Sequence, residues 1–418
     1  GLLSAAELSD LQSRTSFLRN DLVAVSYNAL MTKIKGSAQT LAEKLVDTDK
    51  AVYGPAAELL GVYPSKFQKL YGNASSFLPR KTGDGYLIKN EKELVRILTK
   101  TLINYNNILE IDISDYSGDI VQDFKETMTV AIEWATKITG VRDIVKSWEY
   151  TCRGNCLKAE IAYRYAKSEF EARKSRAAAA VKKARYIVAN NVSIDMTDFE
   201  KEKILHDYIV ENARYDYENY VNGTLPDEAY EEYGCLVSGN TVCEGYARGM
   251  KLLCDLAGIE CMLITGSEMN SDNTQGHIWN IVKIDGDYYH LDVTNNDAIT
   301  STGIERPTYR YFNLTDHEMA RAYSWNRAMY PSCTSIENNY YYKNNLLAYS
   351  REDFDRALTE ALKKHSPAIE LKVTDYSKNK YSNFADVIFK SNIVAKYRYM
   401  IIDELGIISI FDIKYREQ

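Results

Sequence analysis

The sequence predicts a protein of the α+β class, and three observations support this. Apolar residues recur at helical spacing through the first region of the chain, and short alternating segments lie between helical stretches over residues 83–166. Downstream, the two-residue turn signal Asp285-Gly286 separates two strand-like segments, and a helix is expected to begin near Cys243. We expect this helix to pack on the antiparallel sheet that contains the two strands.

Composition places the chain among ordinary globular proteins. Its 418 residues are 45% hydrophobic and 26% charged. The formal net charge of −7 argues against nucleic acid as a main partner, because no basic domain offsets it. No apolar run approaches the roughly 18 uninterrupted residues of a membrane helix, so we expect no membrane span.

Residues 1–82 are expected to form a helical region. Apolar side chains recur there at intervals of three, four and seven residues, at Leu8, Leu11, Leu18, Leu22 and Val25. Residues 41–60 continue in the same way up to Gly61. The region carries no chemical motif, so we assign it a packing or spacer role.

Residues 83–166 are expected to form a small α/β domain. The pattern predicts strands at 86–89, 108–113, 146–151 and 157–163, and helices at 91–104 and 120–137. Cys152 and Cys156 flank the turn of the last hairpin, where a disulfide could form. Residues 167–196, rich in alanine, lysine and arginine, are expected to form a connecting helix.

Residues 197–345 are expected to form the domain that carries the chemistry. It opens with Thr197-Asp-Phe-Glu, a capping-box pattern that predicts the start of a helix. The apolar side of this helix is placed at Ile204, Tyr208, Ile209 and Ala213. Residues 346–418 are expected to form an accessory region, with a helix at 351–364 followed by strands at 369–373, 394–402 and 407–413.

Cys243 is the candidate nucleophile. Thr241 and Glu244 have the spacing of a capping box, which would place Cys243 in the first turn of a helix ending at Gly258. The positive end of the helix dipole would favour the thiolate there. Gly245 is expected to leave room above the sulfur for a substrate or a facing strand. Taken alone, a packed structural cysteine is the alternative.

His277 and Asp292 are predicted to meet on one face of a hairpin. If the Asp285-Gly286 turn closes with Ile284 opposite Asp287, the strands 277–284 and 287–294 make His277 and Asp292 diagonal neighbours. The other face would carry a continuous apolar surface. Asp292 could then accept a hydrogen bond from one ring nitrogen of His277 while the other nitrogen faces the thiol.

These segments resemble the transglutaminase-like superfamily of papain-type thiol enzymes. The matching segments are Gly-Asn-Thr-Val-Cys-Glu-Gly-Tyr-Ala at 239–247, His-Ile-Trp-Asn at 277–280 and Asp-Val-Thr at 292–294. Residues 203–208 and 311–314 also look like bacterial members. The resemblance implies a papain-like core in which Cys243 is the nucleophile, His277 the general base and Asp292 the orienting acid. It departs at Asn295, where the family often has tryptophan.

The expected activity is thiolate attack on a glutamine carboxamide or peptide carbonyl, giving a thioester that passes to an amine or to water. The partners would be a protein or peptide substrate and, for transfer, an amine acceptor. The backbone N–H of Cys243 and the side chain of Tyr215 are candidates for the oxyanion site, and Trp279 for a wall of the cleft or the core. A non-catalytic cell-surface binding or scaffold protein that keeps the fold is the alternative.

No cofactor and no metal are expected, because the chain has no phosphate-binding loop and no zinc-ligand spacing. His206 and Asp207 are assigned to helix packing or to the solvated surface. An odd count of seven cysteines leaves one unpaired, with Cys243 the natural candidate. Since the chain begins at Gly1, we expect a trimmed form in an extracellular or cell-envelope setting, with a cytoplasmic one as the alternative.

Overall fold

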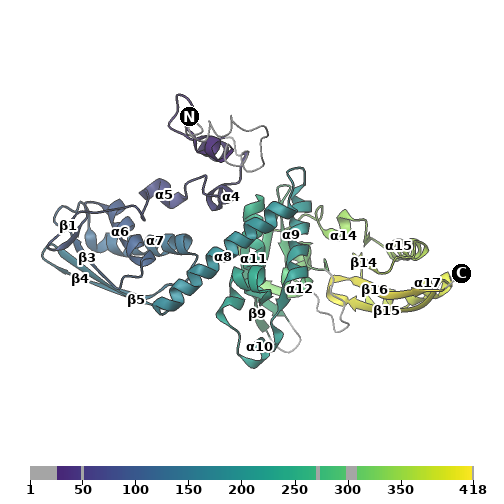
Figure 1. Ribbon diagram of the computed structural model, residues 1–418. Helices are drawn as coiled ribbons and strands as arrows, with labels where there is room; N and C mark the ends of the chain where they lie inside the picture. Colours follow the sequence, from purple (N-terminus) through teal and green to yellow (C-terminus); the bar gives the residue numbers. More distant parts are fainter. Residues whose placement is uncertain (1–25, 49–50, 270–273, 298–307, 417–418) are drawn as a thin grey trace, which may run out of the picture. The chain divides into compact units, whose positions relative to one another are not determined.

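The computed structural model describes residues 26–48, 51–269, 274–297 and 308–416 (Figure 1). Helices and strands are both abundant, which confirms the α+β class. The chain divides into two compact units, Gly1–Arg185 and Tyr186–Gln418, called unit 1 and unit 2 below. The division falls within helix α8, Lys167–Asn191. Among the described helices, none has the length and apolar character needed to cross a membrane.

Unit 1 contains a five-stranded sheet in the order β1-β2-β3-β5-β4. Its strands are β1 Lys81–Thr82, β2 Gly85–Leu87, β3 Ile108–Asp112, β4 Val145–Arg153 and β5 Cys156–Tyr163. Helices α6 (Glu91–Ile103) and α7 (Ile120–Thr139) lie along one face of this sheet (Figure 1). The side chains between them are apolar, including Leu98, Ile111 and Phe124. The predicted strands and helices of this region all occur, with ends shifted by a few residues.

The start of unit 1 is a series of short helical segments. They are residues 26–31, α3 (Leu41–Glu43), a π-helical turn η1 (Lys44–Thr48), α4 (Gly54–Leu59) and α5 (Lys66–Tyr71). Capping boxes at Thr40 and Ser65 start two of them, and Gly72, with φ +77°, ends α5. The described part is therefore helical as predicted, but broken. The predicted apolar series Leu8, Leu11, Leu18, Leu22 and Val25 lies outside the described residues.

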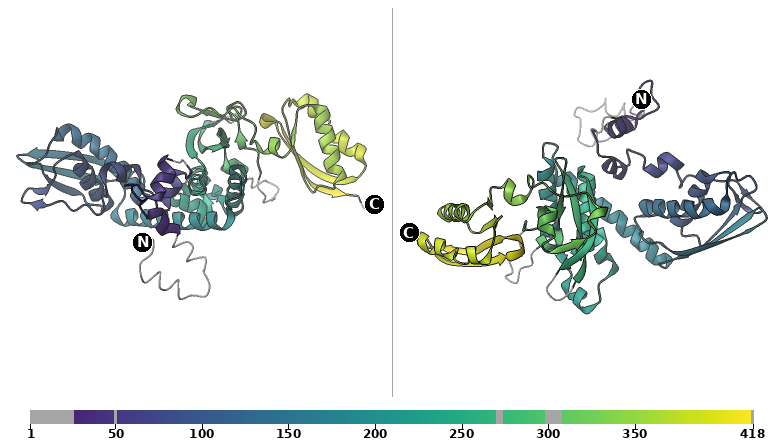
Figure 2. Two further views of the ribbon diagram at one scale, coloured as in Figure 1. Left: turned by 90° about the horizontal axis from the view of Figure 1, so that it is seen from above. Right: turned by 180° about the vertical axis from the view of Figure 1, so that it is seen from behind.

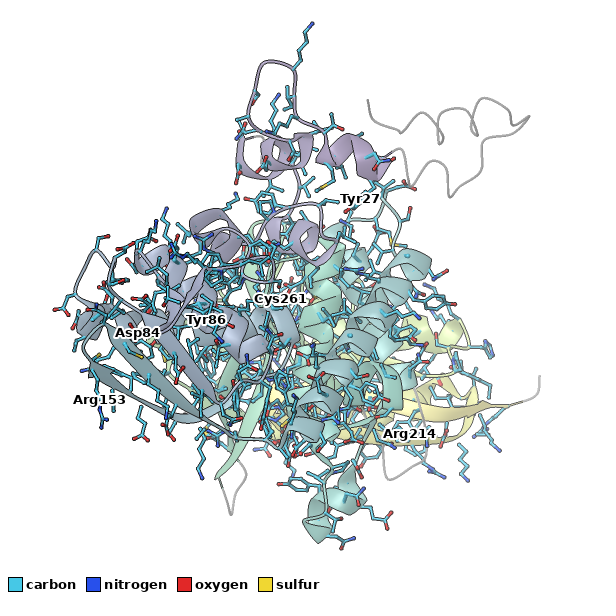
Figure 3. All side chains as sticks on the ribbon, turned by 60° about the vertical axis from the view of Figure 1, so that its left-hand side comes forward. Tyr27, Asp84, Tyr86, Arg153, Arg214 and Cys261 are labelled. Atoms are coloured by element: carbon cyan, nitrogen blue, oxygen red, sulfur yellow. The ribbon has the colours of Figure 1, made fainter. Side chains whose placement is uncertain are left out.

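All seven cysteines of the chain are free thiols. In the hairpin of β4 and β5, Cys152 pairs with Leu157, whereas Cys156 pairs with Arg153, which projects outward in Figure 3. Because opposed residues share a face and successive residues alternate, the two cysteines project from opposite faces. The disulfide considered for this hairpin therefore does not form.

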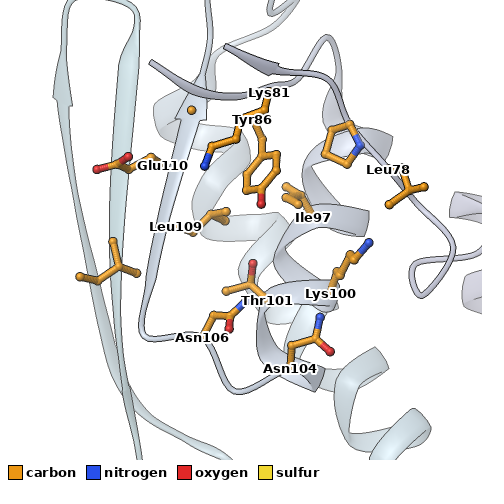
Figure 4. Close-up of a pocket in the computed structure, with 13 residues that line it drawn as sticks. Leu78, Lys81, Tyr86, Ile97, Lys100, Thr101, Asn104, Asn106, Leu109 and Glu110 are labelled. Atoms are coloured by element: carbon orange, nitrogen blue, oxygen red, sulfur yellow. The ribbon is translucent and has the colours of Figure 1, made fainter. Parts of the chain in front are cut away.

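Unit 1 also contains a cavity of about 430 Å³ between α6 and the neighbouring strands (Figure 4). Tyr86, Lys100 and Thr101 border it, and the rest of its lining includes no cysteine or histidine. The groups needed for thiol chemistry thus lie elsewhere, in unit 2.

Unit 2 is built around a second five-stranded sheet in the order β11-β10-β9-β8-β12. Its strands are β8 Cys261–Met269, β9 Thr274–Ile284, β10 Asp287–Leu291, β11 Phe312–Leu314 and β12 Tyr323–Trp325. The elements around it are α9 Asp198–Asn212, β6 Arg214–Tyr215, α10 Tyr217–Asn222, η2 Asp227–Tyr230, η3 Gly234–Ser238, β7 Asn240–Thr241, α11 Cys243–Ala257, α12 Val293–Asn296, α13 Asp316–Met319, η4 Arg327–Met329 and α14 Tyr340–Lys343. Helix α11 packs on β9, where the Asn280 side chain donates a hydrogen bond to the Ala247 carbonyl at 2.9 Å.

Helix α9 starts with the predicted capping box between Thr197 and Glu200. Its buried side, however, is turned from the predicted one. Ile204 and Tyr208 are half-buried, whereas Glu202 and His206 are fully buried with the apolar residues of the helix. The pattern of apolar residues predicted the wrong face because the buried face includes two ionisable side chains, Glu202 and His206.

A third sheet, in the order β13-β14-β16-β15, completes unit 2 (Figure 2). Its strands are β13 Leu347–Ala348, β14 Ile369–Val373, β15 Val394–Ile402 and β16 Ile407–Tyr415, with the helical elements α15 Arg351–Lys363, α16 Lys378–Tyr381, α17 Ala385–Ser391 and η5 Asp403–Leu405. Lys372 forms an ion pair with Glu318, and the Tyr341 hydroxyl bonds to Glu370 at 2.6 Å. These contacts connect the third sheet to the preceding residues. The boundaries between the five regions expected from the sequence remain predictions.

Candidate active site

Cys243 is the first residue of α11, and its side chain is half-buried. The predicted capping box is wrong, because Val242 is the N-cap residue and no side chain caps the helix. Thr241 lies in β7 and donates its hydroxyl to the Ala229 carbonyl at 2.8 Å instead. The thiol still lies at the helix N-terminus, where unpaired N–H groups and the dipole favour a negative charge.

Glycine is required at position 245 for a different reason from the one predicted. A Cβ atom there would lie 1.9 Å from the Thr241 hydroxyl and 2.6 Å from the Ala229 carbonyl oxygen. The glycine therefore lets β7 and η2 pack directly against α11. Its contribution is to hold the segment before Cys243 in place, and the space it leaves is already filled by protein.

The hairpin has the predicted register up to its last pair. Ile284 is opposite Asp287, and Asn280 is opposite Leu291. The second strand ends there, earlier than predicted, since Asp292 is the N-cap of α12 and accepts a hydrogen bond from the Asn295 N–H at 3.3 Å. The short helix still leaves the Asp292 Oδ2 atom 2.8 Å from Nε2 of His277.

Both faces of the hairpin are buried. Asn280, on one face, contacts α11. Trp279 and Ile281, on the other, belong to a separate apolar cluster with Tyr323 and Leu405. His277 is consequently only 8% exposed.

The surroundings of the His277 ring favour its protonated form. Burial alone would lower its pKa, but the Asp292 charge and hydrogen bond outweigh burial, and interactions with the Cys243 side chain add to them, so the pKa of His277 rises to about 10. Nε2 is bonded to Asp292, which leaves Nδ1 as the nitrogen available to the thiol. The structure thus brings Cys243, His277 and Asp292 together.

Asp292 is fully buried and accepts hydrogen bonds from three side chains. Besides His277, the Tyr323 hydroxyl donates at 2.8 Å and the Asn295 amide at 3.0 Å. Burial opposes ionisation, yet His277 and these two donors hold the pKa of Asp292 below its usual value. Tyr323 was not identified from the sequence, where no local pattern links it to Asp292. Asn295 stood out only as a departure from the family pattern.

Trp279 stacks beside His277, with ring centroids 5.9 Å apart and planes at 19°. Its indole N–H donates to Nδ1 of His290 at 3.0 Å, and Nε2 of His290 lies 2.8 Å from Asp316. His290, which lies in β10, therefore helps to position the tryptophan. Trp279 itself is 1% exposed and belongs to the core.

The side chains of His290, Asp316 and Cys333 lie close enough to suggest a metal site, with their ligand atoms within 4.8 Å of one another. The Trp279 N–H, however, requires Nδ1 of His290 to be the hydrogen-bond acceptor. The ring proton then resides on Nε2, which donates to Asp316 and has no lone pair for a metal. The group fits a hydrogen-bonded chain better than a metal centre.

Tyr215 and Tyr230 lie close enough to Cys243 for its charge to act on their hydroxyls. Tyr215 lies in β6 and is paired with Thr241 of β7. Thr241 comes two residues before Cys243, the first residue of α11. Burial raises the pKa of the Tyr215 hydroxyl well above its ordinary value, and the Cys243 charge raises it further. Burial and the same charge also raise the pKa of Tyr230. Both hydroxyls are therefore protonated hydrogen-bond donors near the sulfur, and Tyr230 was not identified from the sequence.

Residues 185–293 match the profile of the transglutaminase-like superfamily. Kyphoscoliosis peptidase of Homo sapiens is 26% identical over 167 residues, which are 35% of this chain and 25% of the relative. The Mus musculus protein of the same name is 24% identical over 123 residues, 28% of this chain and 18% of the relative. The chain thus spans a quarter or less of the length of these curated relatives.

Two solved structures match parts of the chain at lower sequence identity. A protein of Cytophaga hutchinsonii assigned as a cysteine protease has a TM-score of 0.23 and 14% identity, covering 35% of this chain and 61% of its own. A structure described as a TGase has a TM-score of 0.25 and 13% identity, covering 48% of this chain and 53% of its own.

Proposed function

We propose that the chain is a cysteine enzyme acting on glutamine or peptide amide bonds, on the premise that its residues 185–293 match the transglutaminase-like superfamily. One observation carries the proposal. A half-buried thiol at a helix N-terminus adjoins a histidine whose far nitrogen is 2.8 Å from a fully buried aspartate. This is the arrangement that nucleophilic catalysis by a thiol requires.

The reaction begins with attack of the Cys243 thiolate on the amide carbonyl carbon, which forms a C–S bond. The protonated His277 ring donates its proton to the amide nitrogen, the C–N bond breaks, and an amine or ammonia leaves. A second nucleophile, water or an amine, then attacks the thioester and gives a proton to His277. The C–S bond breaks and the thiolate is restored, so no redox partner is needed.

The negative oxygen of the tetrahedral intermediate needs donors next to the sulfur. The backbone N–H of Cys243 is one of the first N–H groups of α11, which have no partner within the helix. The Tyr215 hydroxyl is the second candidate, and its raised pKa keeps it a donor at neutral pH. Asp292 contributes by holding the His277 ring with Nδ1 toward the thiol.

The name of the curated relatives supports an amide substrate, since both are described as peptidases. The superfamily profile equally supports transfer to an amine. A protein or peptide is therefore the proposed acyl donor, and either water or an amine the acceptor.

Alkylation of the cysteines by iodoacetamide near pH 5.5, followed by mass spectrometry, tests the proposal. Cys152 is an internal control, because it is more exposed than Cys243 and burial raises its pKa. We expect Cys243 to react much faster than Cys152, and His277→Ala to remove the difference. Equal rates for both thiols, unaffected by the substitution, would show that Cys243 is not activated.

A further inference from the structure

Glu268 lies on the same face of the sheet as His277 and Tyr323. In the pairing of β8 with β9, Gly266 is opposite His277, so Glu268, two residues along, projects from the same face. In the pairing of β8 with β12, Glu268 is directly opposite Tyr323. Three adjacent strands thus place a carboxylate diagonally beside the histidine and next to the tyrosine that bonds Asp292.

The Glu268 carboxylate forms no hydrogen bond or ion pair with any residue that the structure describes. It is nevertheless only partly exposed, and burial raises its pKa. The nearby His277 acts in the opposite direction, while Asp292 and Glu404 raise the pKa further. His277 is already engaged with Asp292, so its charge is shared between the two carboxylates.

The surroundings of Glu268 suit an organic cation. Tyr323 is directly opposite it in the sheet, and the Tyr323 ring contacts the Tyr311 ring with centroids 5.6 Å apart. The Glu268 charge also contributes to the raised pKa values of Tyr215, Tyr311 and Tyr323. A partly desolvated carboxylate together with aromatic rings favours an ammonium group, through a charge-assisted hydrogen bond and cation–π contacts. The site thus has a carboxylate that feels the charge of His277 but forms no hydrogen bond or ion pair with a described residue.

We propose that Glu268 binds an alkylammonium group of the substrate next to the carbonyl that Cys243 attacks. This inference rests on the proposed function only for the position of the carbonyl. Two sources have the same chemistry, namely the second, non-reacting ammonium of a diamine that accepts the acyl group and a lysine side chain in the acyl-donor peptide. Glu268 would then be a specificity residue for positively charged substrates.

Binding is tested first without turnover, by NMR titration of 1,5-diaminopentane against the intact protein. Glu268→Gln keeps the size of the side chain and removes its charge, and Glu337→Gln is the matched control because Glu337 is exposed on another segment of unit 2. We expect Glu268→Gln to weaken binding about tenfold and Glu337→Gln to leave it unchanged, the size expected for a charge-assisted hydrogen bond. Equal binding by all three proteins would overturn the proposal.

Kinetics then identify the source of the cation. For the acceptor, the rates with 1,5-diaminopentane and with hydroxylamine, which is neutral at pH 7.5, are compared. For the donor, peptides with lysine or norleucine next to the reacting residue are compared. Glu268→Gln should lower kcat/KM about tenfold for the charged member of one pair and spare the neutral member. Loss of the charged and neutral reactions alike would overturn the proposal, since it would indicate a role in orienting His277.

The proposed enzyme activity and the proposed cation site can be refuted independently of each other. If Cys243 shows no selective alkylation but diaminopentane binding still depends on Glu268, the proposed enzyme activity fails and the cation site stands. If Cys243 is selectively alkylated and no cation binding depends on Glu268, the cation site fails alone. Thermal unfolding of Glu268→Gln, expected to match that of Glu337→Gln, shows that the variant is folded.

Discussion

The two five-stranded sheets of the molecule bury different kinds of side chain. In unit 1, α6 and α7 cover the sheet with an apolar cluster, and the buried hydroxyls of Thr127 and Thr139 bond to carbonyls of their own helix. Among its described residues, Asp112 is the one ionisable side chain that is buried. Among the described residues of unit 2, seven acidic or basic side chains are buried, namely Glu202, His206, Glu231, His277, His290, Asp292 and Lys372.

This difference shows that unit 2 buries polar groups that cost stability but are needed for the proposed catalysis. A buried charge costs several kcal/mol unless it is paired, so apolar burial is the simplest way to stabilise a sheet. Unit 1 follows that rule. In unit 2, His277, Asp292 and His290 are buried but hydrogen-bonded around one tryptophan, beside the only described cysteine that starts a helix. Their pairing orients the reactive groups, and unit 1 has no comparable network among its described residues.

The strongest test of this contrast is Asp292→Asn. The substitution keeps the side-chain shape but removes the charge that fixes the His277 tautomer and raises its pKa. We expect turnover to fall by about 10³–10⁴-fold, as for the equivalent loss in other catalytic triads. Steady-state kinetics with an amide substrate measures this. Asp112→Asn, in the sheet of unit 1, should leave turnover unchanged, and a comparable loss there would end the distinction between the two sheets.

Glu202 gives the next largest effect, on stability. Burial raises the pKa of this fully buried carboxyl to about 8, above its ordinary value of 4.5. Between these two values the unfolded chain loses the proton while the folded protein keeps it, so stability falls as the pH rises from about 4.5 to 8. Glu202→Gln removes this titration and retains an acceptor for the Asn313 amide, which donates at 2.7 Å.

We therefore expect Glu202→Gln to be more stable than wild type by about 4–5 kcal/mol at pH 8 and nearly equal to it at pH 4.5. Urea unfolding at several pH values measures the difference. Glu211→Gln, an exposed position on the same helix, is the control and should follow the wild-type curve. Parallel curves for wild type and Glu202→Gln would show that Glu202 is ionised in the folded protein.

Much of the fold follows from local patterns, which explains what the sequence predicted well. The period of apolar residues located α6 and α7, and the Asp285-Gly286 turn determined the hairpin register and so the meeting of His277 with Asp292. These features depend on residues close to one another in the chain. No knowledge of the tertiary structure is needed to infer them.

The errors arose where a distant residue decides the outcome. Thr241 has a capping-box spacing, but the Ala229 carbonyl, twelve residues away, takes its hydroxyl. Tyr323 reaches Asp292 across 31 residues of sequence, and no pattern in the sequence links the two. Glu202 belongs to the buried side of α9 because the amide of Asn313, 111 residues away, donates a hydrogen bond to one of its oxygens. Polar partners of this kind become visible only in the folded structure.

The chain of Trp279, His290 and Asp316 gives a smaller effect than Glu202. His290→Phe leaves the buried indole N–H without an acceptor, which should cost about 1–3 kcal/mol of stability. Because Trp279 stacks beside His277, we also expect a several-fold loss of turnover and a shift in the pH profile of Cys243 alkylation. His206→Phe replaces another fully buried histidine and should affect stability without moving that profile. Identical profiles for the two variants would assign His290 a purely structural role.

The smallest predicted effect on stability concerns Tyr323, one of the three donors to Asp292. Tyr323→Phe removes a 2.8 Å hydrogen bond but leaves the bonds from His277 and Asn295. One such bond contributes about 1 kcal/mol, so turnover should fall roughly five- to tenfold. Tyr341→Phe is a matched control in the same unit, because it removes a 2.6 Å bond from a buried tyrosine to a different carboxylate, Glu370. Both variants should lose similar stability in urea, and only Tyr323→Phe should lose turnover. Equal turnover in the two would mean that the position of Asp292 is maintained by His277 and Asn295 alone.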